Sequence, residues 1–244
     1  MNKDAAKVPR CAECGVEKKI CSHEDGTGPA YCPTINMNDV ITASLSGYDV
    51  PAIKKFALNA TIQEGECYVN KGKNNPHVRY AIKPRIQETI EFAHKMGYKR
   101  LGIAFCVGLR NEAKIVSEIL RAQGFEMASV ICKAGRTPKE SLGIQEEQKV
   151  DPEGPEAMCS PITQAKILNA THTEFNILLG LCVGHDSLFM RYSDALCTVL
   201  VAKDRVTGHS PLAAIHLYKS YYRKLTQEKF NKGGSITVTV EETI

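Results

Sequence analysis

Apolar and polar residues follow two different patterns along the chain, and the pattern changes near residue 99. Residues 37–98 are predicted to be mainly helical, because segments 50–58 and 84–96 carry apolar side chains at helical spacing. Pro51 suits a first helical turn, and Gly97 suits a helix end. We therefore expect a helical lead-in that covers one face or edge of the sheet that follows.

From residue 99 onward, short apolar runs alternate with helical segments. The runs have the length and composition of buried parallel strands, and they occupy 100–106, 125–132, 175–182 and 196–202. Helices are predicted at 112–122, 161–170 and 211–225, a long polar connection at 134–157, and a final strand at 235–240. This alternation predicts an α/β fold, with three layers and a mostly parallel, Rossmann-like or flavodoxin-like sheet.

The first 36 residues have too few apolar side chains to bury a core, so an ordered structure here needs another source of stability. Four cysteines, Cys11, Cys14, Cys21 and Cys32, supply one. The C-x-x-C pair lets two thiolates reach one metal, and the other two complete a four-thiolate site for zinc or iron–sulfur. We therefore predict a Cys-rich metal-binding module at 1–36. The α/β domain at 37–244 then comprises the helical lead-in, 37–98, and the alternating part, 99–244.

Composition narrows the function classes. The chain has 244 residues, 43% of them hydrophobic and 24% charged, and a net charge of only +4, which gives no case for a nucleic-acid partner. A membrane partner is not expected either, because no run of about 20 apolar residues occurs. The N-terminus leads to Cys11 without an apolar stretch, so no secretory signal is expected and a cytoplasmic location is predicted. In a reducing compartment, ten cysteines indicate metal binding or thiol chemistry rather than disulfides.

A second group of cysteines lies at the ends of predicted strands. Cys106, Cys132 and Cys182 end the first three strands, and Cys159 precedes the helix that begins at Pro161. In an open parallel sheet, ligands bind outside the carboxyl ends of the strands, where the strand order reverses. If the first strand lies between the second and the third, these four cysteines converge on one cofactor-binding site.

Two further cysteines, Cys67 and Cys197, are expected to be ordinary packing residues.

Polar residues follow the same strand ends. His185 and Asp186 come after the third strand, Lys203 and Asp204 after the fourth, and His209 precedes the last helix. His185 suits a general acid or base or a metal ligand, whereas Asp186 also suits a helix cap. Lys203 and Arg205 suit the binding of an anionic group, or Lys203 and Asp204 pair with neighbours. The candidate catalytic residues are His185, Asp186, Lys203, Asp204 and His209.

Motifs for dinucleotide binding, P-loop nucleotide binding and a serine nucleophile elbow are absent from the sequence.

Four segments, together with the N-terminal cysteines, carry a resemblance to a known family: 102–109, 158–165, 180–189 and 203–209. Over nearly its whole length the chain is similar to an uncharacterised family of domains of unknown function, described as predicted metal-binding proteins and common in anaerobic prokaryotes. The family usually has Asn where Ser160 and Ser210 stand, so no role is expected of those two side chains. The resemblance implies metal binding and a cytosolic location, and it implies no reaction. A looser, fold-level similarity is to iron–sulfur enzymes that hold a cluster at strand ends.

Three functions remain open. The preferred one is a redox protein with an iron–sulfur cluster on Cys106, Cys132, Cys159 and Cys182, and a second cluster or a structural zinc in the N-terminal module. The first alternative is a zinc- or thiolate-dependent enzyme without electron transfer, in which a strand-end cysteine is the nucleophile and His185 the base. The second is a metal carrier or sensor. The expected partner is a redox protein or a small-molecule substrate, and an exposed strand at 235–240 would suit a homodimer.

Overall fold

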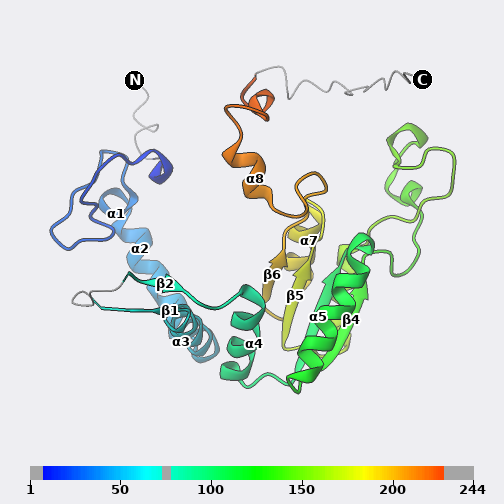
Figure 1. The fold of residues 1–244 in the computed structure, drawn as a ribbon, viewed down its shortest axis with the longest axis horizontal. Coiled ribbons are helices and arrows are strands. Elements are labelled where there is room, and N and C mark those ends of the chain that lie inside the picture. Colours follow the sequence, from blue (N-terminus) through cyan, green and yellow to red (C-terminus); the bar gives the residue numbers. More distant parts are fainter. Residues whose placement is uncertain (1–7, 73–77, 228–244) are drawn as a thin grey trace. The chain divides into compact units, whose positions relative to one another are not determined.

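The computed structural model describes residues 8–72 and 78–227 of the chain, and it divides into two compact units, Met1–Lys83 and Pro84–Ile244 (Figure 1). The predicted Cys-rich segment 1–36 belongs to the first unit, which continues to Lys83. Independent folding of residues 1–36 therefore stays a prediction.

The first unit is mainly helical after the cysteine-rich segment. Its elements are α1 (Pro33–Asn36), α2 (Asn38–Leu45), α3 (Pro51–Glu66) and the antiparallel pair β1 (Tyr68–Val69) and β2 (Tyr80–Ala81). The helix predicted at 50–58 is confirmed, and it continues to Glu66. The short strand pair carried no periodic signal because each strand has only two residues. Cys67 is buried beside it, as expected for a packing residue.

The second unit is an α/β domain built on four parallel strands. Its elements are α4 (Arg85–Met96), β3 (Arg100–Phe105), α5 (Arg110–Ala122), β4 (Glu126–Ile131), α6 (Pro161–Ala170), β5 (Phe175–Leu179), α7 (His185–Tyr192), β6 (Cys197–Val201) and α8 (Pro211–His216). The strand order is β4-β3-β5-β6, and every pair is parallel. This is the order of the first four strands in flavodoxin-like sheets. The α/β prediction is therefore confirmed, and the strand order reverses between β3 and β5.

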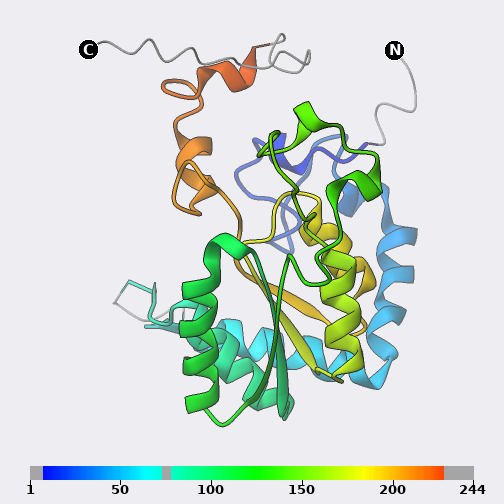
Figure 2. The same cartoon turned by 90° about the vertical axis from the view of Figure 1, so that its right-hand side faces the viewer.

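Helices cover both faces of this sheet, which gives three layers (Figure 2). On one face the ring of Phe92, in α4, lies 5.5 Å from that of Phe175, in β5, and α5 lies over β3 and β4. On the other face, α6 and α7 enclose a core with the sheet that includes Leu168, Leu178 and Phe189. Because both faces are covered, strands β3 and β5 are buried almost throughout, which explains their continuous apolar sequences.

The end of the chain corrects one prediction. The helix expected at 211–225 stops at His216, and turns follow up to a short 3₁₀ segment at Arg223–Thr226. Apolar side chains of this stretch, among them Leu212 and Tyr221, are exposed, so no packing supports a longer helix. The strand expected at 235–240, and the homodimer prediction that rests on it, lie outside the described residues.

In the described part of the chain, none of the helices combines the length and the apolar character that a membrane span requires.

Candidate functional site

Two of the strand-end cysteines are neighbours at the carboxyl edge of the sheet. Cys106 follows β3 and Cys132 follows β4, and the paired register of the two strands ends with Phe105 opposite Ile131. The Cys132 N–H donates to the carbonyl of Phe105 at 2.9 Å. Both thiols are buried, so the sheet fixes where each one lies.

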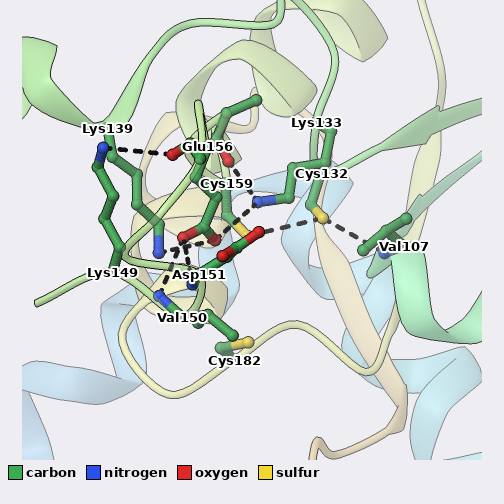
Figure 3. Close-up of polar contacts among 12 residues, drawn as sticks. Val107, Cys132, Lys133, Lys139, Lys149, Val150, Asp151, Glu156, Cys159 and Cys182 are labelled. Atoms are coloured by element: carbon green, nitrogen blue, oxygen red, sulfur yellow. Dashed lines mark hydrogen bonds and ion pairs between the residues drawn. The ribbon is translucent and has the colours of Figure 1, made fainter. Parts of the chain in front are cut away.

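Cys159 joins this pair from a distant part of the chain. The Ser160 N–H donates to the carbonyl of Cys132 at 2.7 Å, which brings the chain back to the end of β4. The Sγ atoms of Cys159 and Cys132 are 3.7 Å apart (Figure 3). The Val107 N–H also donates to the Cys132 sulfur, at 3.3 Å. The Cys132 sulfur therefore lies between a backbone donor and a second thiol.

Ion pairs order the connection 133–158, which precedes Cys159 and places it at the edge of the sheet. Glu156 accepts from Lys139 at 2.8 Å and from the Val150 N–H at 3.0 Å, and the Lys139 bond holds its pKa below the usual range (Figure 3). The ammonium of Lys149 is almost fully buried and pairs with two more carboxylates, Glu140 and Glu146. The polar character of this segment thus reflects an ordered ionic network.

The two paired thiols differ in acidity. The hydrogen bond from Cys132 lowers the pKa of Cys159 to about 5, and the positive charges of Lys133, His185 and Lys139 lower it further against the cost of burial. The same contact and burial raise the pKa of Cys132. The contact between the two sulfurs therefore makes Cys159 the more acidic thiol of the pair.

Cys182 lies on the same edge, after β5, with a different partner. Nη2 of Arg205 donates to its sulfur at 3.0 Å. Arg205 follows Asp204, whose carboxylate accepts the N–H groups of Val206 and Thr207, both at 2.9 Å. The first cause of the lowered pKa of Asp204 is the Thr207 N–H. Sequence analysis considered Arg205, together with Lys203, as a holder of an anionic group, and it did not foresee the contact of Arg205 with the Cys182 sulfur.

The five candidate catalytic residues separate into two groups. Asp204 and His209 fix the loop after β6, since the Asp204 N–H donates to Nδ1 of His209 at 3.1 Å. Asp186 accepts the N–H of the next residue, Ser187, within the first turn of α7, whose N-cap is Gly184, so it does not cap the helix. His185 and Lys203 remain available at the edge. His185 starts α7 and acts electrostatically on Cys159, and Lys203 reaches across the ends of the strands.

The four N-terminal cysteines line one small cavity in the first unit. Cys11, Cys14, Cys21 and Cys32 border a volume of about 70 Å³ together with Tyr31. A backbone bridge between Lys19 and Thr27 closes the loop that joins them. Gly28 allows a close approach, because a Cβ there would lie 3.0 Å from the Cys32 sulfur. All four cysteines therefore border the same cavity.

Neither group of cysteines forms a compact ion cage. Within residues 8–72 and 78–227, no set of three or more His, Cys, Asp or Glu side chains lies close enough to hold a single metal ion.

A comparison with protein families matches residues 32–200 to the family described as "Protein of unknown function (DUF1847)". The chain belongs to this family. The matched residues include all four cysteines of the sheet edge. Neither this description nor the relative below carries a metal or an activity in its name, so the metal binding that the resemblance implies stays a prediction.

A curated relative covers more of the chain than the family match does. The uncharacterized protein MJ0455 of Methanocaldococcus jannaschii is 47% identical over 220 residues, which are 90% of this chain and the whole of that protein. No solved structure matches the chain.

Proposed function

We propose that this DUF1847 protein is a metal-binding redox protein that carries an iron–sulfur cluster on the thiolates of Cys106, Cys132, Cys159 and Cys182. The strand order carries the proposal, because β3 lies between β4 and β5. The four cysteines follow or approach the carboxyl ends of these three strands, where open α/β sheets bind their ligands. A bound cluster would supply one-electron transfer.

The edge presents four thiols from separate segments, the ends of β3, β4 and β5 and the connection before α6. A cluster takes each thiolate at a different metal atom, so its ligands can lie further apart than those of one ion. The Val107 N–H at the Cys132 sulfur and Arg205 at the Cys182 sulfur are donors of the kind that tune a cluster's potential.

The N-terminal cavity would hold structural zinc or a second cluster. None of residues 8–36 is buried, so apolar packing contributes little to the order of this segment. A metal bound by the four thiols would supply the missing stabilisation.

Metal analysis of protein purified without oxygen tests both sites. We expect iron and acid-labile sulfide in the wild type, and their loss in the double variant Cys106→Ala/Cys182→Ala. The variant Cys11→Ala/Cys14→Ala should lose the N-terminal metal and retain the edge cluster. Cys197→Ala is the matched control, because Cys197 is also half-buried in the second unit and lies at the start of β6, away from the edge.

Unchanged iron and sulfide in the Cys106→Ala/Cys182→Ala variant would overturn the cluster assignment. Zinc near one per chain, without iron or sulfide, would also overturn it.

A second candidate function rests on the acidity of Cys159. A half-buried thiolate beside His185 is suited to nucleophilic attack on a small-molecule substrate, without electron transfer. The zinc-only outcome would favour this function over the redox protein.

A further inference from the structure

Lys203 stands out at the sheet edge because its ammonium has no partner. Among the described residues it forms no hydrogen bond and no ion pair, although the side chain is half-buried. The carboxylate of the adjacent residue, Asp204, already accepts loop N–H groups. Burial without a partner costs free energy that a bound anion would offset.

The side chain extends across the sheet edge. Lys203 follows β6, and its Cδ lies 3.7 Å from the position that a Cβ on Gly180, after β5, would occupy. Its Nζ lies 3.3 Å from the corresponding position on Gly108, after β3, and the Cys106 sulfur lies 4.0 Å from that same position. The ammonium therefore lies at the ends of β3 and β5, where the strand order reverses.

Glycine at position 108 leaves room between the ammonium and the Cys106 sulfur. A side chain there would enter this space. The 13-residue helix α5 begins two residues later, and no side chain caps its N-terminus. Its first N–H groups add positive potential to that of Lys203.

A second unsatisfied group lies at the end of the adjacent strand. Ser160 is 3% exposed and its hydroxyl has no hydrogen-bond partner in the described structure, whereas its N–H is bonded to Cys132. Buried hydroxyls are normally satisfied by protein, water or ligand atoms. The edge thus contains an unpaired cation and an unpaired hydroxyl beside the thiols.

We propose that Lys203 binds the carboxylate or phosphate group of a small substrate and places it against Cys106. The proposal names an anionic small molecule as the substrate class of the redox centre. Any reaction of that substrate rests on the proposed function. Binding of the anion itself depends only on Lys203 and its surroundings, so the two proposals fail separately.

Calorimetric titration of inorganic phosphate, and separately of acetate, into protein purified without oxygen tests the proposal. Low ionic strength limits screening of the charges. We expect one or both anions to bind, and Lys203→Met to weaken that binding about tenfold or more, as for loss of a charge-assisted hydrogen bond. Lys203→Arg should retain part of it. Lys114→Met is the matched control, because Lys114 is an exposed lysine on α5 of the same unit.

Iron and sulfide content of each sample separates the outcomes. Lys203-dependent anion binding in protein without iron would support the site and reject the cluster. Absence of binding to the wild type, or equal affinity in Lys203→Met, would overturn the anion site. Loss of iron in Lys203→Met with unchanged anion affinity would also overturn it, because Lys203 would then be a counter-ion of the cluster.

Discussion

The two groups of cysteines are positioned by different physical means. At the sheet edge, Cys106 and Cys132 are buried at the ends of hydrogen-bonded parallel strands. In the N-terminal segment, Cys11 and Cys21 are exposed, and turns and one isolated backbone bridge connect the four thiols. The folded sheet can therefore present its thiols without a metal, whereas under the proposed function the N-terminal segment would take its order from a bound metal.

Metal removal should have the largest effect, and only on the N-terminal group. After chelation under reducing conditions, amides of residues 11–32 should lose their protection against hydrogen exchange, while those of β3 and β5 keep theirs. Structural zinc in small domains contributes roughly 10–16 kcal/mol of apparent binding free energy, most of which is folding free energy. Hydrogen exchange with mass spectrometry measures both regions in one experiment. Retained protection at 11–32 would show that the segment is stable without metal.

Loss of a core side chain should lower the stability of the second unit, which carries the sheet edge, and leave the N-terminal cysteine group unchanged. Phe189 is fully buried between α7 and the sheet, so Phe189→Ala should lower the free energy of unfolding of the second unit by about 3–5 kcal/mol. Urea unfolding followed by circular dichroism measures this change. The N-terminal metal content should stay the same.

The substitution Gly28→Ala should affect the N-terminal cysteine group and leave the second unit unchanged. A Cβ at this position would lie 2.9 Å from the Cβ of Cys32, so it should displace that thiol and reduce N-terminal metal content. The unfolding free energy of the second unit should not change. Equal effects of Gly28→Ala and Phe189→Ala on both regions would contradict the separation.

The smallest effect concerns the acidity of one edge thiol. In metal-free protein, alkylation of Cys159 by iodoacetamide should rise with pH through about 5 and level off above, because the thiolate is the reactive form. Lys133→Met removes a positive charge that stabilises the thiolate, so it should move the midpoint to higher pH. Cys132→Ala removes the first cause of the low pKa and should move it further.

Peptide mapping of the alkylated cysteine measures these midpoints, and exposed Lys114→Met is the control that should leave them unchanged. A midpoint that neither Cys132→Ala nor Lys133→Met moves would rule out this origin of the acidity.

Apolar periodicity predicted the bounds of an element well where its apolar residues are buried and where a Pro or Gly marks its end. The helix predicted at 161–170 has those bounds in the structure, because Pro161 opens it and Ala165 and Leu168 are buried in the core. The helix expected at 211–225 begins at Pro211 as predicted but ends at His216, because periodicity alone cannot show that its apolar side chains lack a partner. Helix α7 has only eight residues. Its apolar pattern was too short to predict where the helix ends, so only a helix start near Asp186 was expected.

By itself, the sequence determined the number and spacing of the thiols, the alternation of strands and helices, and which cysteines end strands. The tertiary structure decided which strands are neighbours, that Cys159 meets Cys132, and that Lys203 reaches the end of β3. The reason is physical: a residue's position within a strand depends on a local period, whereas strand order and the return of the 133–158 connection depend on contacts between distant segments. Local composition contains no record of those contacts.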